Sequence, residues 1–267
     1  MSYDDQIRVA VVGTANVAQT VKFIAEHERS THVKYFVIAD EPPNVSDKIK
    51  FIKREEIADV VSGLDTVFML TALDDAATCK TAHIVADCVQ FVWLPVAVIQ
   101  SASDEFFYEL LYLQENFGVV INLAEQQFSQ TAEDFAYKIV HGIHSIYDED
   151  FYPYLMPMDF ADMIELFNCG KKTFVSFGEA SGEKPSIAAV NAALDSPPVK
   201  ENLQCACSVF VNIIGSCDSL LMLEANEAAT LVYEAMNPDG NFYFAVNLDE
   251  ALGEKIFAMI VVCVSEP

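Results

Sequence analysis

The sequence predicts an α/β fold, because short apolar runs alternate with helix-like segments along its first half. Each apolar run has the length of a strand, and such alternation is typical of a mostly parallel sheet that helices cover on both faces. The chain has 267 residues, of which 52% are hydrophobic, so it is long enough for two medium-sized domains. We predict a first domain over 1–128, a central helix over 129–150 and a second α/β domain over 151–267.

The first domain is predicted from the order of its strands and helices. Ser103 opens one helix as an N-cap, Gly118 closes it, and the acidic pair Asp74 and Asp75 opens another, as the helix dipole favours. The apolar runs predict strands at 7–13, 33–39, 65–73, 90–98 and 119–125. The segments between them predict helices at 15–28, 53–63, 74–89 and 103–118, and a turn-rich loop at 40–48.

The second half begins with a long amphipathic helix. Its apolar positions Phe135, Ile139, Ile143 and Ile146 keep helical spacing. The elements that follow are strands at 171–182, 205–215, 241–249 and 255–264, and helices at 160–167, 184–196 and 223–236. The helix at 184–196 is expected to end before Pro197, because the residue before a proline is disfavoured in a helix.

The charge of the chain excludes several classes of partner. The formal net charge is −25 and the isoelectric point is near 4.3, so the surface repels nucleic acid and anionic membranes. The amino terminus lacks the pattern of a signal peptide, and the longest apolar run is strand-sized. We therefore expect a cytoplasmic protein that contacts neither nucleic acid nor the membrane directly.

Several residue types are expected to serve the fold alone. The seven cysteines are scattered, and Cys205 and Cys207 have the wrong spacing for a zinc or redox motif, so buried free thiols on a strand are expected. His141 and His144 lie three residues apart, but a third metal ligand is missing nearby in the sequence. The aromatic residues expected in the core are Trp93, Phe106, Phe107, Tyr108 and Tyr112.

Five separated blocks in the second half carry a family resemblance. They are Met158–Asp162, Phe177–Gly182, Ala193–Pro197, Val209–Ile213 and Asp218–Glu224. In order and approximate spacing, from about residue 156 to the end, they resemble FtsZ, the bacterial and archaeal relative of tubulin. The first half is similar only in the order of its elements. It is several tens of residues shorter than in the family, around 38–53, where FtsZ carries a further helix and a phosphate-contacting loop. The resemblance implies a truncated FtsZ-like nucleotide-type domain, a central helix and an FtsZ-like second domain.

The resemblance also implies two glycine-rich loops for GTP, and both are degenerate here. The first loop keeps Gly13 and Asn16 but has lost its glycine cluster, and the second has Asp74 and Asp75 where the family has glycines. Glycine lets backbone N–H groups approach phosphate closely. A carboxylate about 4 Å from a phosphate charge costs about 1 kcal/mol in water and about 4 kcal/mol near a protein surface. That cost exceeds the roughly 0.3–1 kcal/mol gained from a helix dipole. We therefore expect no GTP and no other cofactor.

A third loop of the family is better kept. FtsZ inserts it into the nucleotide site of the next subunit, where two acids position the attacking water. The resemblance places those acids at Asp159 and Asp162, and it places Pro157 where the family has an asparagine, so that an amide is lost and the backbone is stiffened. The alternative is that the two acids only cap the helix at 160–167, a role that suits Asp159.

The hypothesis that follows is a non-catalytic FtsZ-like protein, a pseudo-GTPase that binds or regulates FtsZ-type filaments. FtsZ filaments grow head to tail, so a subunit with the loop face but without a nucleotide face would dock on one filament end and cap it. The chain stops at Pro267, before any anchoring tail of the family, which again argues against direct membrane contact. One alternative is a scaffold that assembles by itself without nucleotide. Another is an enzyme or sensor that binds a small molecule at the carboxyl ends of the first-domain strands, near Gly13 and Ala72.

Overall fold

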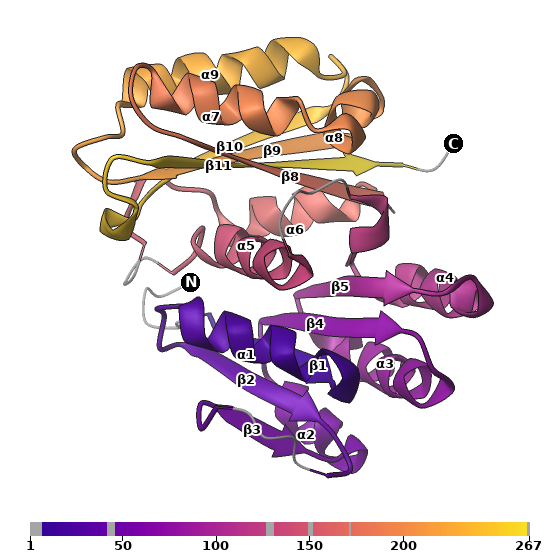
Figure 1. Ribbon diagram of the computed structural model, residues 1–267. Helices are drawn as coiled ribbons and strands as arrows, with labels where there is room; N and C mark the ends of the chain where they lie inside the picture. Colours follow the sequence, from indigo (N-terminus) through magenta and orange to yellow (C-terminus); the bar gives the residue numbers. More distant parts are fainter. Residues whose placement is uncertain (1–6, 42–45, 127–130, 149–151, 171, 266–267) are drawn as a thin grey trace. The chain divides into compact units, whose positions relative to one another are not determined.

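The computed structural model describes residues 7–41, 46–126, 131–148, 152–170 and 172–265. The chain divides into two compact units (Figure 1). The first holds residues 1–124 and 130–140, and the second holds 125–129 and 141–267. The long central helix is α5, which covers Ala132–His144 rather than the whole of the expected range, and both units share it. The predicted residues 129, 130, 149 and 150 of this helix lie outside the described part of the chain.

The first unit is built on a six-stranded sheet in the order β3-β2-β1-β4-β5-β6. All of its strand pairs are parallel. The strands are β1 (Val9–Thr14), β2 (Val33–Ile38), β3 (Ile49–Ile52), β4 (Thr66–Leu73), β5 (Leu94–Ala102) and β6 (Val119–Asn122). The helices are α1 (Ala18–His27), α2 (Ile57–Val61), α3 (Ala76–Cys88) and α4 (Phe107–Asn116). The prediction of a mostly parallel sheet is confirmed.

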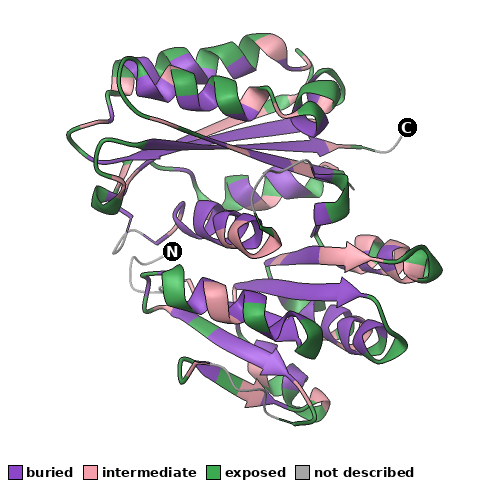
Figure 2. Ribbon diagram, in the orientation of Figure 1, coloured by how far each residue is buried: buried purple, intermediate pink, exposed green. Residues whose placement is uncertain are grey.

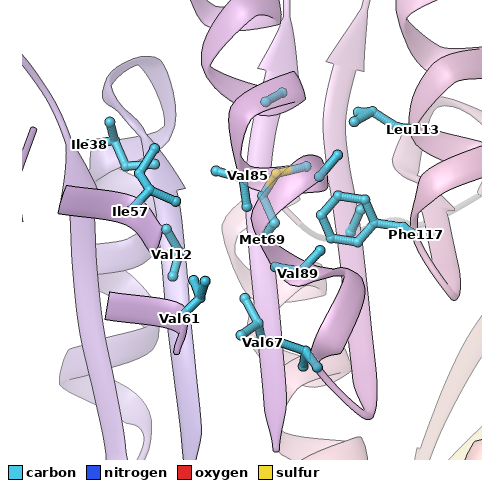
Figure 3. Close-up of a cluster of buried hydrophobic side chains, with 14 of the residues drawn as sticks. Val12, Ile38, Ile57, Val61, Val67, Met69, Val85, Val89, Leu113 and Phe117 are labelled. Atoms are coloured by element: carbon cyan, nitrogen blue, oxygen red, sulfur yellow. The ribbon is translucent and has the colours of Figure 1, made fainter. Parts of the chain in front are cut away.

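The core of this unit lies between one face of the sheet and the helices α2, α3 and α4 (Figure 3). Figure 3 shows Val12 of β1 beside Ile57 and Val61 of α2, and Met69 of β4 beside Val85 of α3. Side chains alternate between the two faces of a strand, so the neighbouring positions of β1 face the other way, toward α1. Both faces of the sheet are therefore covered, which is why its strands are almost continuously buried (Figure 2).

The second unit has a five-stranded mixed sheet in the order β7-β10-β9-β11-β8. Its strands are β7 (Tyr154–Met156), β8 (Lys172–Ala180), β9 (Ser208–Gly215), β10 (Asn241–Leu248) and β11 (Ile256–Val264). Strands β9 and β10 run parallel, while β11 runs antiparallel to β8 and β9. The helices are α6 (Phe160–Asn168), α7 (Pro185–Leu194), α8 (Pro197–Asn202) and α9 (Met222–Ala235). Helices α7 and α9 bury one face against the sheet and expose the other (Figure 2).

Three elements differ from the expectation. Strand β3 directly follows the loop predicted over 40–48, where no strand was expected, and strand β7 was not expected either. Both are short edge strands whose existence depends on pairing with β2 and β10, a contact that local sequence does not encode. Pro197 begins helix α8 as well as following α7, because proline at the first position of a helix lacks only an N–H that would have no partner there.

Several aromatic and sulfur-bearing side chains were wrongly expected in the core. Trp93 is 57% exposed, because β5 begins one residue later and Trp93 lies outside the strand. Phe107 and Tyr108, at the start of α4, are 54% and 79% exposed. Cys205 and Cys217 are exposed as well. Cys205 lies in a 3-10 turn and Cys207 directly precedes β9, so neither lies on the strand, and Cys207 is bonded to Cys169 rather than free.

No helix in the described ranges combines the length and the apolar character needed to cross a membrane.

Candidate functional site

The carboxyl ends of β1 and β4 lie side by side, where the strand order of the first sheet changes direction. In open α/β sheets this switch point is the usual place for a ligand. A cleft of about 430 Å³ opens beside it. Thr14, Asn16, Arg54, Asp75 and seven neighbouring residues line the cleft, whereas Gly13 and Ala72 do not.

Gly13 is explained by packing. A Cβ atom at this position would lie 2.3 Å from Cγ2 of Val21, so glycine is what allows α1 to lie close to β1. Glycine at position 13 therefore has a structural reason that is independent of any phosphate.

The amide of Asn16 holds two strand ends together. Its Nδ2 donates to the carbonyl of Ala72 over 2.9 Å, and its Oδ1 accepts from the hydroxyl of Thr14 over 2.7 Å. The Thr14 hydroxyl also lies 3.0 Å from the hydroxyl of Thr71 on β4. These bonds orient Asn16 along the edge of the sheet and occupy both polar atoms of its side chain.

Asp75 occupies the amino terminus of α3. Its Oδ1 accepts from the backbone N–H groups of Ala77 (2.8 Å) and Thr78 (2.9 Å), and its Oδ2 accepts from the Thr78 hydroxyl (2.7 Å). The hydrogen bonds from Thr78 lower the pKa of the Asp75 carboxyl. Two of the N–H groups that could have received an anion, those of Ala77 and Thr78, are therefore bonded to a carboxylate that the chain itself supplies.

Asp74 points to a different partner. Its two carboxylate oxygens lie 3.0 and 2.8 Å from the hydroxyl of Ser101, at the end of β5. The adjacent acids thus have separate tasks, since Asp75 caps α3 and Asp74 binds the neighbouring strand.

Arg54 is one of the cleft residues that the sequence analysis did not predict. Its Nε donates to the Thr81 hydroxyl on α3 (2.8 Å), and one terminal nitrogen lies 3.8 Å from Asp40. Arg54 is the single cation among the lining residues, against the carboxylates of Asp40 and Asp75. The lining therefore carries one more negative than positive charge. A basic residue at the start of the helix predicted over 53–63 was the available signal, but its approach to Thr81 depends on the fold.

The removal of the Asp75 cap is expected to weaken α3. Asp75→Ala should lower the free energy of unfolding by about 1 kcal/mol at neutral pH, the usual value for a lost N-cap. Because the folded-state pKa is lowered, the stabilisation is present above the unfolded pKa and is lost as the pH falls through the folded value. Denaturant unfolding at pH 7 and at decreasing pH measures both effects. Asp75→Asn is the matched control, because asparagine caps a helix about as well as aspartate, and it should change stability by less than about 0.5 kcal/mol. An equal loss in both variants would contradict the capping role.

The acids of the third loop lie in the second unit. Asp159 is the N-cap of α6, and its Oδ1 accepts from the N–H of Ala161 over 2.9 Å. Asp162 lies in the first turn of the same helix, and both acids and Pro157 are exposed. The capping role considered as an alternative is thus present at Asp159, together with full access to solvent. The exposed carboxylates can accept hydrogen bonds from a partner without moving the helix.

Two further residues extend this surface. Burial, followed by the charges of Glu165 and Asp162, raises the pKa of Tyr243 on β10. Helix α6 therefore presents Asp159, Asp162 and Glu165 at three-residue spacing beside a tyrosine of the sheet. We call the exposed set Pro157, Asp159, Asp162 and Glu165 the loop face.

The two histidines of α5 lie in different surroundings. His144 Nε2 lies 3.3 Å from Asp148 Oδ2, and the ring of His141 packs edge-on against Tyr152 with centroids 5.0 Å apart. Within the described ranges, no three His, Cys, Asp or Glu side chains gather closely enough to hold a metal ion.

Sequence comparison relates the second unit to a known family. A family model described as "FtsZ family, C-terminal domain" matches residues 172–265. Cell division protein FtsZ 1 of Thermococcus kodakarensis is 26% identical over 248 residues, which span 84% of this chain and 65% of that protein. Its counterpart in Archaeoglobus fulgidus is 24% identical over 241 residues, spanning 82% of this chain and 64% of the relative. The second unit is therefore similar to the C-terminal domain of the FtsZ family, and most of the chain is similar to archaeal FtsZ proteins.

Solved structures support this FtsZ-like assignment for the whole fold. An empty FtsZ dimer of M. jannaschii superposes with a TM-score of 0.81 at 18% identity, covering 98% of this chain and 89% of that one. A GTPγS-bound protofilament of CetZ2 from Haloferax volcanii gives a TM-score of 0.66 at 10% identity, covering 97% and 94%. The predicted fold class is confirmed. The matches to the two curated FtsZ proteins span about 65% of their length.

Proposed function

We propose that this FtsZ-like chain is a non-catalytic regulator that binds the end of an FtsZ-type filament through its loop face. The observation that carries the proposal is Asp75, whose carboxylate accepts from both N–H groups at the start of α3. A phosphate would have to displace that carboxylate and then lie beside it, at a cost of about 4 kcal/mol near a protein surface. The exposed acids Asp159 and Asp162 support the other half of the proposal, since they leave the loop face available to a partner.

Two structural neighbours were solved with a guanine nucleotide, which favours nucleotide binding by this chain. CetZ2 of Haloferax volcanii was solved with GTPγS, and CetZ1 of the same organism with GDP. Those proteins bind guanine nucleotides, so nucleotide binding by this chain is the first point to test.

A thermal shift experiment tests nucleotide binding directly. We expect 1 mM GTP with magnesium to leave the midpoint of thermal unfolding unchanged. A Kd of about 10 μM would add about 2.7 kcal/mol at that concentration, which is readily measured as a rise of several degrees. Such a rise would contradict the pseudo-GTPase proposal.

Filament regulation is tested by titration into FtsZ from the same organism. Substoichiometric amounts of this chain, added with GTP, should change the rate of phosphate release and shorten the filaments seen by electron microscopy. A filament end is present at far lower concentration than its subunits, so an effect well below equimolar indicates end binding. No change at any ratio would contradict the proposal.

A second candidate is self-assembly without nucleotide. The observation that favours it is the M. jannaschii FtsZ dimer, which is described as empty. Analytical ultracentrifugation without nucleotide distinguishes the two, since a concentration-dependent rise in mass supports self-assembly and a monomer at all concentrations supports the regulator.

A small-molecule function rests on the cleft of about 430 Å³ beside Asn16 and Arg54, which is within the range of ligand sites. Native mass spectrometry of the purified protein would detect a bound molecule.

A further inference from the structure

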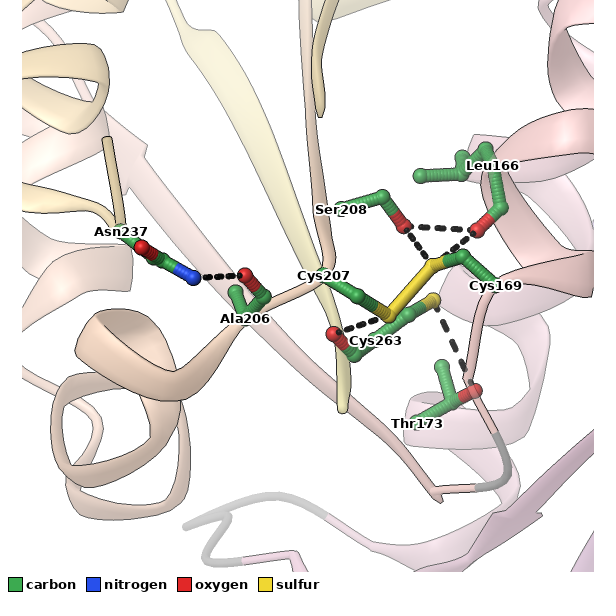
Figure 4. Close-up of a disulfide and its surroundings, with 8 residues drawn as sticks. All are labelled: Leu166, Cys169, Thr173, Ala206, Cys207, Ser208, Asn237 and Cys263. Atoms are coloured by element: carbon green, nitrogen blue, oxygen red, sulfur yellow. Dashed lines mark hydrogen bonds between the residues drawn. A yellow bond between two sulfur atoms is a disulfide. The ribbon is translucent and has the colours of Figure 1, made fainter. Parts of the chain in front are cut away.

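A disulfide joins α6 to the central strand of the second sheet (Figure 4). Cys169 is the C-cap of α6, and Cys207 is the residue before β9. The two positions are 38 residues apart in sequence and 6.1 Å apart between Cα atoms. Both residues are partly exposed, so a thiol in solution can approach the bond.

The same end of α6 has a second, weaker attachment. The hydroxyl of Ser208 donates to the carbonyl of Leu166 over 2.7 Å and lies 2.8 Å from the sulfur of Cys169. Met163, Leu166 and Phe167 are buried beneath the helix. If the disulfide opens, these contacts keep α6 on the sheet, while its last turn loses its covalent anchor.

The neighbouring thiols differ in their access to the disulfide. The backbone carbonyl of Cys263 on β11 lies 3.3 Å from the sulfur of Cys207, but the Cys263 thiol is fully buried. Burial raises the pKa of that thiol to about 11, so it stays protonated and does not compete as a nucleophile. Cys205, two residues before Cys207, is free and exposed. A thiolate that attacks the disulfide therefore comes from the solvent side and not from the buried Cys263.

We propose that Cys169–Cys207 is a reversible redox modification site whose co-reactant is a dithiol reductant. A thiolate of the reductant attacks one sulfur and forms a mixed disulfide, while the other cysteine leaves as a thiolate. The second thiol of the reductant then breaks the mixed disulfide. Two electrons and two protons pass to Cys169 and Cys207, and the reductant ends as its own disulfide. The oxidised state clamps the carboxyl end of the helix whose amino end carries Asp159 and Asp162.

Hydrogen exchange with mass spectrometry tests the clamp in the isolated protein. We expect millimolar dithiothreitol, without denaturant, to open the disulfide within minutes and to raise the intact mass by two hydrogens. Amides in the last turn of α6 should then exchange about tenfold faster, because local opening no longer stretches a covalent link. Cys207→Ser and Cys169→Ser should exchange at the fast rate with or without reductant. If neither variant folds, the reduced wild-type protein supplies the same comparison.

Cys217→Ser is the matched control, because Cys217 is an exposed free cysteine elsewhere in the same unit. It should keep the full response to reductant. Two results would overturn the proposal. One is alkylation of Cys169 and Cys207 in the air-oxidised protein, and the other is a disulfide that resists dithiothreitol or whose opening leaves the exchange of α6 unchanged.

The consequence for filaments rests on the proposed function and is measured separately. A clamped helix presents its acids with less conformational freedom, so the oxidised protein should bind a filament end about three- to tenfold more tightly. A redox response of α6 without any filament binding would contradict the proposed function and leave the modification site supported. If the protein binds filaments but reductant changes neither that binding nor the exchange of α6, the modification site is contradicted and the proposed function is supported.

Discussion

Asp159→Asn combined with Asp162→Asn is expected to abolish the effect of this protein on FtsZ filaments. Asparagine is as good an N-cap as aspartate, so the bond from the Ala161 N–H survives and α6 keeps its start. What the variant loses is two exposed negative charges on the loop face. Each charged hydrogen bond to a partner is worth about 1.5–3 kcal/mol, so affinity for a filament end should fall at least tenfold.

The measurement is the titration of phosphate release and filament length, with both proteins at fixed salt. Glu55→Gln with Glu115→Gln is the matched control, because it removes the same charge from exposed positions of the first unit. That pair should leave the regulator fully active. Equal loss in both double variants would mean that net charge, rather than the loop face, governs the interaction. Full activity of the loop-face variant would mean that other residues make the contact.

Gly178→Ala is expected to be strongly destabilising. A Cβ at this position of β8 would lie 1.9 Å from the backbone carbonyl oxygen of Ala189 and 2.8 Å from the backbone nitrogen of Ala193. Both atoms belong to the backbone of α7, so no rotamer change relieves the overlap and the helix must move off the sheet. We expect a loss of about 3 kcal/mol or more in the free energy of unfolding, or roughly 6–12 °C in Tm.

Gly182→Ala provides the comparison for this effect. Gly182 has a φ of +92°, but a Cβ there would meet nothing within 4 Å. Its substitution should therefore cost only about 1 kcal/mol through backbone conformation. Both glycines lie in the block that resembles FtsZ, so the pair separates a packing requirement from a conformational one. Similar losses in the two variants, measured by denaturant unfolding, would contradict the close approach of α7 to β8.

Much of the fold was predictable because its elements are long and regularly patterned. The buried strands β4 and β9 are nearly continuous apolar runs in the sequence, and α5 has apolar residues at helical spacing. The short edge strands β3 and β7 were missed, since three or four residues carry too little periodicity to predict a strand. Trp93 was misplaced because a run of apolar residues does not show where the strand begins.

The candidate sites, like the fold, were predictable from the sequence only in part. The sequence by itself showed a resemblance to FtsZ, and it predicted from that resemblance that Asp74 and Asp75 replace glycines and that Asp159 and Asp162 match the loop acids. Residue identity allows such predictions because a side chain limits how closely a backbone can approach phosphate.

Only the tertiary structure decided what those residues do. In the structure, Asp75 accepts hydrogen bonds at the start of α3. Asp74 accepts a hydrogen bond from Ser101, and Arg54 donates one to Thr81. A disulfide also joins Cys169 to Cys207 across 38 residues. The physical reason is that a hydrogen bond or a disulfide needs its two groups within a few ångströms of each other. For residues tens of positions apart, that distance is set by how the strands and helices pack.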